Sequence, residues 1–371
     1  MRTTLFSNFR TIKINREVII ISTFRVLNQH DIKSVLEMKS VMNLVEDAYV
    51  FKAKKSASLF PMVFHEFHPG VADMDIKSGK ITEADIFGLK LVSWFGENPS
   101  KGIPAVIGTI LVLDITTGTP LGILSGEYIT LMRTGAAAGI GAKYLAREES
   151  EELLIVGSGH VAPYAILSTL LAMDNIKRVT IYNDNSFDRA QTFSDSIKNK
   201  LFELISPYQE SDASYYYELL KKIEISFVAT DDIKLATQQA DIIITATPSR
   251  KPLIQDIWVQ PGTHISCLGS DMKGKQEIDE ELFTHARIFV DDIDQSFDVG
   301  ESEIPYLKGK FTKQDVIAEI GEVILGNGKG RLSDSDITIY DSTGISLQDL
   351  ITANHILKIA KEKNVGQLAD L

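Results

Sequence analysis

The strongest constraint on the fold is a run of alternating strand-like and helix-like segments that starts after Ala146. Short apolar runs recur at residues 153–156, 179–182, 223–229, 242–245, 264–268 and 287–290, with longer segments between them. This alternation is typical of a parallel sheet whose strands are joined by crossover helices. The sequence therefore predicts an α/β domain with a parallel sheet in the second half of the chain.

The first of these strands leads into a Gly-x-Gly-x-x-Ala turn. The turn reads Gly157-Ser158-Gly159-His160-Val161-Ala162 and opens a helical segment. Backbone N–H groups at such a helix N-terminus can approach the pyrophosphate of a dinucleotide. A plain strand-to-helix turn is the structural alternative, but the strand before and the helix after favour nucleotide binding. His160 is a candidate neighbour of the phosphates rather than a catalytic base.

The end of the next strand, Tyr182-Asn183-Asp184-Asn185, bears on which dinucleotide is bound. An acidic residue here accepts hydrogen bonds from the ribose hydroxyls of NAD and repels the additional phosphate of NADP. Asp184 can do this, and Asn183 is the alternative occupant of the usual position. No arginine directly follows the strand, so we expect NAD, with NADP as the alternative.

Three charged residues are candidates for substrate chemistry. Arg133 precedes a run of small residues, and its planar guanidinium matches a carboxylate in a bidentate way; a surface salt bridge is the alternative. Lys90 lies in an otherwise apolar strand, where it either reaches past the strand end or points into a cleft. Asp271 follows the strand at 264–268, at the edge where ligands bind in α/β sheets, or it is a turn aspartate.

Composition limits the class of protein. A chain of 371 residues is long for one core, so two domains are expected. The net charge of −12 disfavours nonspecific nucleic-acid binding, and no apolar run is long enough for a membrane helix. The one cysteine, Cys267, excludes an internal disulfide, fits a reducing cytoplasm and is expected to be a buried core thiol.

The first part of the chain has a different pattern and reads as a mixed α+β domain. The stretch Asn28-Gln29-His30-Asp31 is expected to be a strand end that turns into a helix N-cap, before a helical pattern that extends to Tyr49. Apolar runs at 61–64, 88–94 and 106–113 predict strands, and a turn at 114–120 predicts that the last of them forms a hairpin with 121–124. Residues 1–23 are interpreted as a strand-like or disordered extension. After a polar stretch at 325–331, residues 337–340 predict a last strand and 347–363 a helix.

Taken together, these residues resemble the ornithine cyclodeaminase/μ-crystallin family over nearly the whole chain from Phe24. The resemblance rests on the order of several short motifs: Gly88-Leu89-Lys90, residues 114–120, Met132-Arg133-Thr134, the Gly157 turn, residues 240–247, Gly269-Ser270-Asp271, and Asp341-Ser342-Thr343-Gly344. It implies a Rossmann-type NAD(P)-binding domain over 146–334. It also implies a mixed α+β domain for substrate binding and dimerisation, formed by 24–145 with 335–371, and a homodimer.

The resemblance also implies roles for individual residues. Arg133 would clamp the α-carboxylate of a small amino-acid substrate, and Lys90 would share that carboxylate and help to polarise the amino or imino nitrogen. Asp271 would orient or deprotonate an amine near the nicotinamide. Thr343 is expected among the substrate-binding residues. The expected cofactor-binding residues are Thr134, Gly157, Gly159, His160, Val161, Ala162, Asn183, Asp184, Thr245, Ala246 and Thr247.

Three functions follow from this resemblance. The first is ornithine cyclodeamination, in which hydride transfer to and from bound NAD converts L-ornithine to L-proline and ammonia. The second is a dehydrogenase acting on an alanine-like amino acid, or a reductase of cyclic imines or ketimines, with net turnover of NAD(P). The third is a crystallin-like binding protein, which the retained Lys90, Arg133 and Asp271 disfavour.

The chain departs from the family in residues 54–80. Family members often carry an arginine there as a further carboxylate contact, and here only Lys54 or Lys55 could replace it. Asp73 and Asp75 could receive a distal ammonium of the substrate or shape a turn. A metal site is not expected, because His65 and His68 in a β-type stretch do not bring their imidazoles together.

Overall fold

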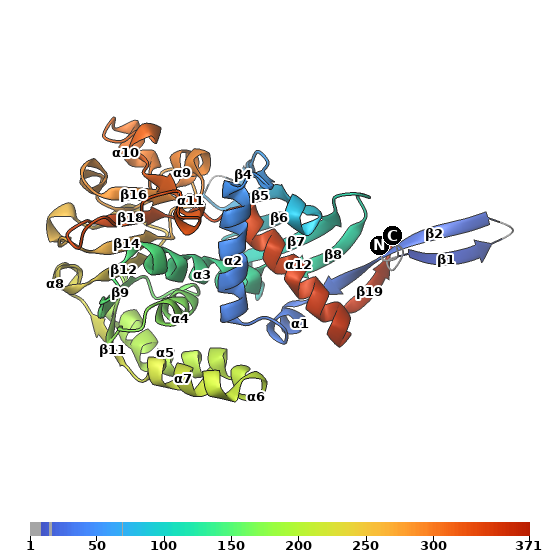
Figure 1. The fold of residues 1–371 in the computed structure, drawn as a ribbon, viewed down its shortest axis with the longest axis horizontal. Helices are drawn as coiled ribbons and strands as arrows, with labels where there is room; N and C mark the ends of the chain where they lie inside the picture. Colours follow the sequence, from blue (N-terminus) through green and yellow to red (C-terminus); the bar gives the residue numbers. More distant parts are fainter. Residues whose placement is uncertain (1–8, 15–16, 69) are drawn as a thin grey trace. The chain divides into compact units, whose positions relative to one another are not determined.

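The computed structural model describes residues 9–14, 17–68 and 70–371. The described chain divides into two compact units, whose elements are labelled in Figure 1. Unit 1 contains the described residues up to Leu36, together with Lys54–Thr130 and Ile345–Leu371. Unit 2 contains Glu37–Ala53 and Leu131–Gly344. The division expected from the sequence gave residues 37–53, 131–145 and 335–344 to the first domain, whereas the structure places these residues in unit 2.

Unit 1 is built on a mixed sheet. In the described residues its strands follow the order β1-β2-β8-β7-β6-β5-β3, with β19 also on β2 and β4 also on β5. Only the β2–β8 pair among these is parallel. The elements are β1 (Phe9–Ile14), β2 (Glu17–Leu27), α1 (Gln29–Lys33), β3 (Ala57–Leu59), β4 (Val63–His68), β5 (Ala72–Ile81), β6 (Ile86–Phe95), β7 (Val106–Asp114), β8 (Pro120–Ser125), α12 (Ser346–Lys363) and β19 (Gln367–Asp370).

Helix α12 covers one face of this sheet, as Figure 1 shows. A Cβ on Gly88 of β6 would lie 2.8 Å from Leu350 Cδ2, and a Cβ on Gly79 of β5 would lie 2.9 Å from Ser346 Oγ. The two glycines therefore let the helix approach the sheet closely. Because side chains alternate across a strand, residues of the same parity as Gly79 in β5 and Gly88 in β6 also point toward the α12 face.

Several local predictions for unit 1 are confirmed. Asn28 caps α1, since its Oδ1 accepts hydrogen bonds from the backbone N–H groups of His30 and Asp31. The predicted hairpin is formed by β7 and β8. The helical pattern is confirmed, but it forms two helices, α1 and, in unit 2, α2 (Met38–Ala53).

The expected N-terminal extension falls partly on residues 1–8, 15 and 16, which lie outside the described residues. In the described part, β1 and β2 form an antiparallel hairpin that Figure 1 shows reaching away from the rest of the sheet. β2 begins at Glu17 and continues into the sheet of unit 1, so the fold of this unit starts before Phe24. Asp73 and Asp75 lie inside β5, so the turn that was one alternative for them is wrong.

Unit 2 is built on a parallel sheet. In the described residues its strands follow the order β11-β10-β9-β12-β14-β18-β16-β17, and every pair is parallel. The strands are β9 (Glu152–Val156), β10 (Arg178–Tyr182), β11 (Ser226–Thr230), β12 (Ile242–Thr245), β14 (His264–Cys267), β16 (Arg287–Val290), β17 (Ala318–Glu319) and β18 (Thr338–Asp341); β13 (Arg250–Ile254) and β15 (Gln276–Ile278) form a separate pair.

Helices alternate with these strands, as the sequence predicts for crossover connections. They are α3 (Glu127–Leu145, which enters unit 2 at Leu131), α4 (Ala162–Ala172), α5 (Phe187–Ile205), α6 (Tyr208–Ser211), α7 (Ala213–Ile223), α8 (Ile233–Gln239), α9 (Ile293–Val299), α10 (Glu303–Leu307) and α11 (Ile320–Ile324). The predicted strand at 223–229 begins only at Ser226, because Ile223 ends α7. A further strand, β19, follows the one predicted to be last.

The order of the first strands identifies the fold class. In chain order, the strands from β11 to β14 read 3-2-1-4-5, which is the doubly wound Rossmann arrangement. The order reverses between β9 and β12, and ligands bind in such sheets where this reversal leaves a crevice at the carboxyl ends. The central strands are buried on both faces: Leu153–Val156 and Ile242–Ile244 have at most 1% exposure. The fold is α/β, with a Rossmann-type unit and a second, mixed α+β unit.

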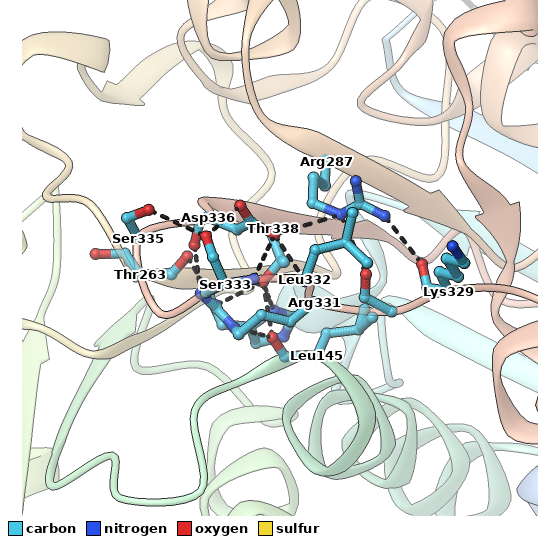
Figure 2. Close-up of polar contacts among 12 residues, drawn as sticks. Leu145, Thr263, Arg287, Lys329, Arg331, Leu332, Ser333, Ser335, Asp336 and Thr338 are labelled. Atoms are coloured by element: carbon cyan, nitrogen blue, oxygen red, sulfur yellow. Dashed lines mark hydrogen bonds and ion pairs between the residues drawn. The ribbon is translucent and has the colours of Figure 1, made fainter.

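The opposite, amino-terminal edge of this sheet is closed by a polar network around Arg331 (Figure 2). Arg331 Nε donates to the carbonyl of Leu145 at 2.9 Å, and one terminal nitrogen donates to Thr338 Oγ1 at 3.1 Å. Arg287 ties the preceding loop to the same edge by donating to the carbonyls of Lys329 and Gly330. The polar stretch at 325–331 is therefore an ordered loop held by side chains.

Candidate functional site

The Gly-rich turn after β9 has the conformation that a nucleotide-binding turn requires. Gly157 has φ +109°, and a Cβ on it would lie 2.6 Å from the carbonyl oxygen of Ala246. A side chain at this position is therefore excluded by both backbone strain and space. Gly159 has no atom within 4 Å of its Cβ position, so a ligand has room to approach the backbone there. Val161 precedes α4, and no side chain caps this helix N-terminus.

A cavity of about 670 Å³ opens beside this turn. It lies at the carboxyl ends of β9, β10 and β12, where the strand order reverses. Its lining residues are Gly157, Ser158, Gly159, Asn183, Asp184, Asn185, Asp188, Arg189, Thr192, Phe193, Ser196, Ala246, Thr247 and Pro248. The open space at Gly159 and the volume of the cavity fit a dinucleotide, so this first cavity is named the nucleotide cavity below.

The segment after β10, Asn183-Asp184-Asn185, is held in place by hydrogen bonds of its side-chain amides. Asn183 Nδ2 donates to Ser158 Oγ at 2.7 Å, which joins the end of β10 to the Gly-rich turn. Asn183 Oδ1 accepts from the N–H of Asn185 at 3.0 Å, and Asn185 Nδ2 donates to Asp184 Oδ1 at 3.0 Å. Arg189 from the first turns of α5 lines the same cavity. Arg189 was not predicted from the sequence, because it lies in α5 and does not directly follow the strand.

A second cavity, of about 620 Å³, shares the Gly-rich turn and lies along α4 and α5. His160 lines this cavity, and its place beside the phosphates of a dinucleotide stays a prediction. Its lining residues are Leu131, Ser158, Gly159, His160, Pro163, Tyr164, Phe193, Ser196, Ile197, Asn199, Lys200 and Glu203.

The remaining predicted cofactor residues, on α3, at the start of α4 and at the end of β12, differ in exposure. Ala246 and Thr247 line the first cavity. Thr245 is fully buried, and its hydroxyl donates to Glu277 at 2.6 Å. Ala162 is also buried, as the first residue of α4, and Thr134 is half-buried on α3. Thr134, Val161, Ala162 and Thr245 line neither of these two cavities, and their assignment to the cofactor stays a prediction.

Arg133 is buried in unit 2, with 6% exposure, and its guanidinium lies against Gly344. A Cβ on Gly344, which has φ +74°, would lie 2.0 Å from one terminal nitrogen of Arg133. Gly344 follows β18, so the guanidinium lies at the carboxyl edge of the parallel sheet, the edge that also carries the nucleotide cavity. A buried cation at this edge is suited to bind an anionic group of a substrate.

Gly344 is itself held by a buried carboxylate. Asp291 Oδ2 accepts from the Gly344 N–H at 2.8 Å, and Asp291 Oδ1 accepts from Thr343 Oγ1 at 2.9 Å. Gln295 Nε2 donates to the same threonine oxygen. The predicted substrate residue Thr343 is therefore part of the support for the Gly344 turn. Burial raises the pKa of Asp291, although its hydrogen bonds oppose this change.

Lys90 lies in unit 1 and forms a buried ion pair that the sequence did not reveal. Its Nζ is 2.8 Å from Asp349 Oδ2, and the two side chains have 2% and 0% exposure. Thr130 Oγ1 lies 3.4 Å from the same ammonium. Lys77 of β5 is directly opposite Lys90 in the sheet and is also buried, so both lysines point toward the α12 face. Lys54 and Lys55 are both exposed, in the turn that directly follows α2.

Asp271 follows β14, as predicted, but its side chain is 52% exposed and forms an ion pair with Lys275. Cys267 at the end of β14 is a buried free thiol, as expected, and burial raises its pKa. His65 and His68 lie on the exposed strand β4, and the described residues contain no group of side chains that could hold a metal ion. Among the described helices, none has the length and apolarity to cross a bilayer.

Comparison with known proteins agrees with this geometry. The family model of the ornithine cyclodeaminase/mu-crystallin family matches residues 23–214 and 205–364. The fold and the nucleotide cavity define a Rossmann-type protein with a second, mixed domain. The chain belongs to the ornithine cyclodeaminase/mu-crystallin family.

Individual relatives cover almost the full chain. The alanine dehydrogenase of Archaeoglobus fulgidus is 35% identical over 341 residues, which are 92% of this chain and 96% of the relative. A solved structure described as an archaeal alanine dehydrogenase dimer with bound NAD has a TM-score of 0.81 and 34% identity, covering 94% of this chain and 99% of its own. The Thermococcus litoralis Δ1-pyrroline-2-carboxylate reductase, solved with NADH and L-proline, has a TM-score of 0.81 and 28% identity, covering 93% and 99%.

Proposed function

We propose that this protein is an NAD-dependent oxidoreductase that interconverts a small α-amino acid and its α-imino acid. The observation that carries the proposal is Arg133, a buried guanidinium at the same sheet edge as the nucleotide cavity. Relatives named alanine dehydrogenase and pyrroline-2-carboxylate reductase support it, because both act on small substrates that carry an α-carboxylate.

The dinucleotide would be held by the Gly157–Ala162 turn, by Asn183 and Asp184 and by Ala246 and Thr247. When bound, NAD supplies the hydride acceptor and NADH the hydride donor. NAD is preferred to NADP, because the Asp184 carboxylate would repel a 2′-phosphate. Titration with NADH and NADPH tests this preference. In Asp184→Ala the ratio of the dissociation constants for NADPH and NADH should fall by about tenfold. An unchanged ratio would show that Asp184 does not bind the ribose.

In this proposal, the carboxylate of the substrate is bound by Arg133. With NAD+ bound as the hydride acceptor, the Cα–H bond of the substrate would break with its electron pair, and the amino nitrogen would lose a proton as the C=N bond forms. Lys90 keeps the role that the family resemblance implies, as a substrate-binding cation, with Asp349 fixing the position of its ammonium. Asp271 is proposed as the group that accepts the proton, and Thr343 as support for the Gly344 turn.

Ornithine cyclodeamination is the second candidate. Asp73 and Asp75 favour it, because in β5 they lie on the same face as Lys77, and Lys77 is opposite Lys90. Such carboxylates could receive the distal ammonium of a diamino acid. Incubation with L-ornithine and catalytic NAD separates the candidates. Proline and ammonia without accumulation of NADH indicate cyclodeamination, and steady NADH formation from another amino acid indicates a dehydrogenase. NADH binding without any turnover would indicate a crystallin-like binding protein.

We also propose a homodimer that forms through unit 1. The face of its sheet away from α12 carries apolar side chains, among them Ile76, Leu91 and Ile107, and Val63 and Ile107 are 48% and 38% exposed. The related archaeal alanine dehydrogenase is described as a dimer. In analytical sedimentation the wild-type protein should be a dimer and the Ile107→Asp variant a monomer. A wild-type monomer would contradict the proposal.

We propose the cytoplasm as the location of the protein, because its single cysteine fits a reducing compartment.

A further inference from the structure

Glu277 is a fully buried acid whose carboxylate lies under two loops at the carboxyl edge of the parallel sheet. Its Oε1 accepts from the N–H of Thr247 at 2.6 Å and from the Thr247 hydroxyl at 2.8 Å. Its Oε2 accepts from the hydroxyl of Thr245 at 2.6 Å and from the N–H of Gly269 at 2.8 Å. Each of these donors is neutral, and together they occupy both carboxylate oxygens.

The first of these loops is a wall of the nucleotide cavity. Thr247 lines the cavity with Ala246 and Pro248, and its Cγ2 lies 3.0 Å from the Cβ position of Gly157. The loop therefore faces the Gly-rich turn directly. A shift of Thr247 by a fraction of an ångström would change the width of the space that a dinucleotide would enter.

The second loop begins at Gly269 and leads to Ser270 and Asp271. A Cβ on Gly269 would lie 2.1 Å from the carbonyl oxygen of Thr247 and 2.5 Å from Glu277 Cδ. The two loops and the carboxylate are therefore in mutual contact. The Glu277 side chain therefore ties the end of β12 to the segment carrying Asp271, in addition to the backbone hydrogen bond from the N–H of Leu268 to the carbonyl of Thr245.

Glu277 is itself held from the other side by further buried acids. Glu301 Oε1 accepts from the N–H groups of Glu277 and Ile278, both at 2.8 Å. Asp341, at the end of β18, accepts from the N–H groups of Glu301 and Ser302. Backbone donors thus connect Glu277 to the strand that leads to Gly344.

We infer that Glu277 is a positioning residue for the dinucleotide: by holding Thr247 and Gly269 together, its carboxylate sets the shape of the nucleotide cavity. The inference rests on the proposed use of NAD and deepens it. A residue that merely stabilises the fold would lower the free energy of unfolding but leave the affinity of the folded protein for NADH unchanged. A positioning residue changes that affinity in protein that is fully folded.

The test is a fluorescence titration of purified protein with NADH, at a temperature where circular dichroism shows each variant to be folded. In Glu277→Gln the side-chain size is kept, but one acceptor oxygen becomes an NH2 group that faces donors. We expect the dissociation constant for NADH to rise about tenfold or more, which is about 1.4 kcal/mol. An NADH affinity equal to that of the wild type would overturn the inference.

A matched pair of milder variants covers the case in which Glu277→Gln does not fold. Thr245→Val removes one donor to Glu277 from the last residue of β12. Thr338→Val removes a buried hydroxyl from the first residue of β18, at the opposite edge of the same sheet (Figure 2). Thr245→Val should weaken NADH binding about threefold while Thr338→Val leaves it unchanged. Equal effects of the two variants would overturn the inference. Wild-type protein that binds no dinucleotide would instead show that the cofactor assignment itself has failed.

Discussion

The guanidinium of Arg133 occupies the space that a side chain on residue 344 would need. A Cβ on Gly344 would lie 2.0 Å from a terminal nitrogen of Arg133 and 2.9 Å from its central carbon. Gly344 is in turn held by Asp291 through its N–H group. Asp291 therefore fixes the position of Gly344, and the missing side chain of Gly344 leaves the space that the Arg133 guanidinium fills.

This relationship predicts that Gly344→Ala displaces Arg133 and weakens substrate binding. Loss of a charge-assisted carboxylate contact costs about 1.5–3 kcal/mol, so KM for the amino-acid substrate should rise about ten- to hundredfold. NADH affinity should stay near the wild-type value. Gly326→Ala is the matched control, because Gly326 also has positive φ (+76°) but has no atom within 4 Å of its Cβ position. An equal KM increase in both variants would mean that backbone strain alone is responsible.

The buried pair Lys90–Asp349 predicts a strong effect of removing one partner. Asp349→Asn leaves a buried ammonium without its carboxylate, so we expect unfolding free energy to fall by about 3–5 kcal/mol. The double variant Asp349→Leu/Lys90→Met replaces the pair by apolar groups and should recover most of that stability, but not the activity. Chemical denaturation and initial rates measure the two quantities separately. Full activity in the double variant would exclude Lys90 from the substrate site.

Glu301 predicts a pH dependence of stability. Burial and the neighbouring Glu277 raise the pKa of Glu301 to about 8 in the folded protein, above the ordinary carboxyl value of 4.5. The folded state therefore keeps a proton that the unfolded chain releases. The contribution of Glu301 to the free energy of unfolding is therefore fully present at low pH and is lost as the pH rises from about 4.5 through 8. In the wild type, Tm should fall between pH 6.5 and 8.5.

His264 does not contribute to the expected change in Tm between pH 6.5 and 8.5. Its pKa is lowered to about 3 by burial, so it costs stability only below its unfolded pKa of about 6.5, where the unfolded chain gains a proton. Glu301→Gln resembles the protonated acid and keeps the oxygen that accepts from Glu277 and Ile278. Its Tm should change less with pH than that of the wild type. Parallel Tm curves for the two proteins would contradict a raised pKa of Glu301.

Features that depend on near neighbours in the chain could be predicted from the sequence. The Gly157–Ala162 turn, the cap at Asn28 and the hairpin of β7 and β8 follow from turn residues and local periodicity. The order of the parallel strands is consistent with the predicted alternation, but periodicity alone did not place β18 between β14 and β16. That position depends on packing between segments far apart in the sequence.

The supporting charges of the site could not be predicted for the same reason. Asp349 lies in α12 and pairs with Lys90 of β6, and no local spacing connects them. Glu277 and Asp291 could have been singled out as acids next to apolar strands, but only the fold shows which loops they hold. Arg133 could be predicted as a substrate-binding candidate because small residues follow it in the sequence. Those small residues have a packing role: a Cβ on Gly135 would lie 2.5 Å from the backbone of Tyr164, so they let α3 approach α4 closely.

The most direct test of the account is the nicotinamide absorbance of wild-type protein and Arg133→Ala, followed with a panel of L-amino acids plus NAD+ and of α-imino acids plus NADH. The account predicts that the wild type turns over at least one of these substrates with a matching change in NADH. Arg133→Ala should bind NADH normally but show a KM for that substrate raised about tenfold or more. The same KM in both proteins, or an equal rate with an amine that lacks the carboxylate, would contradict it.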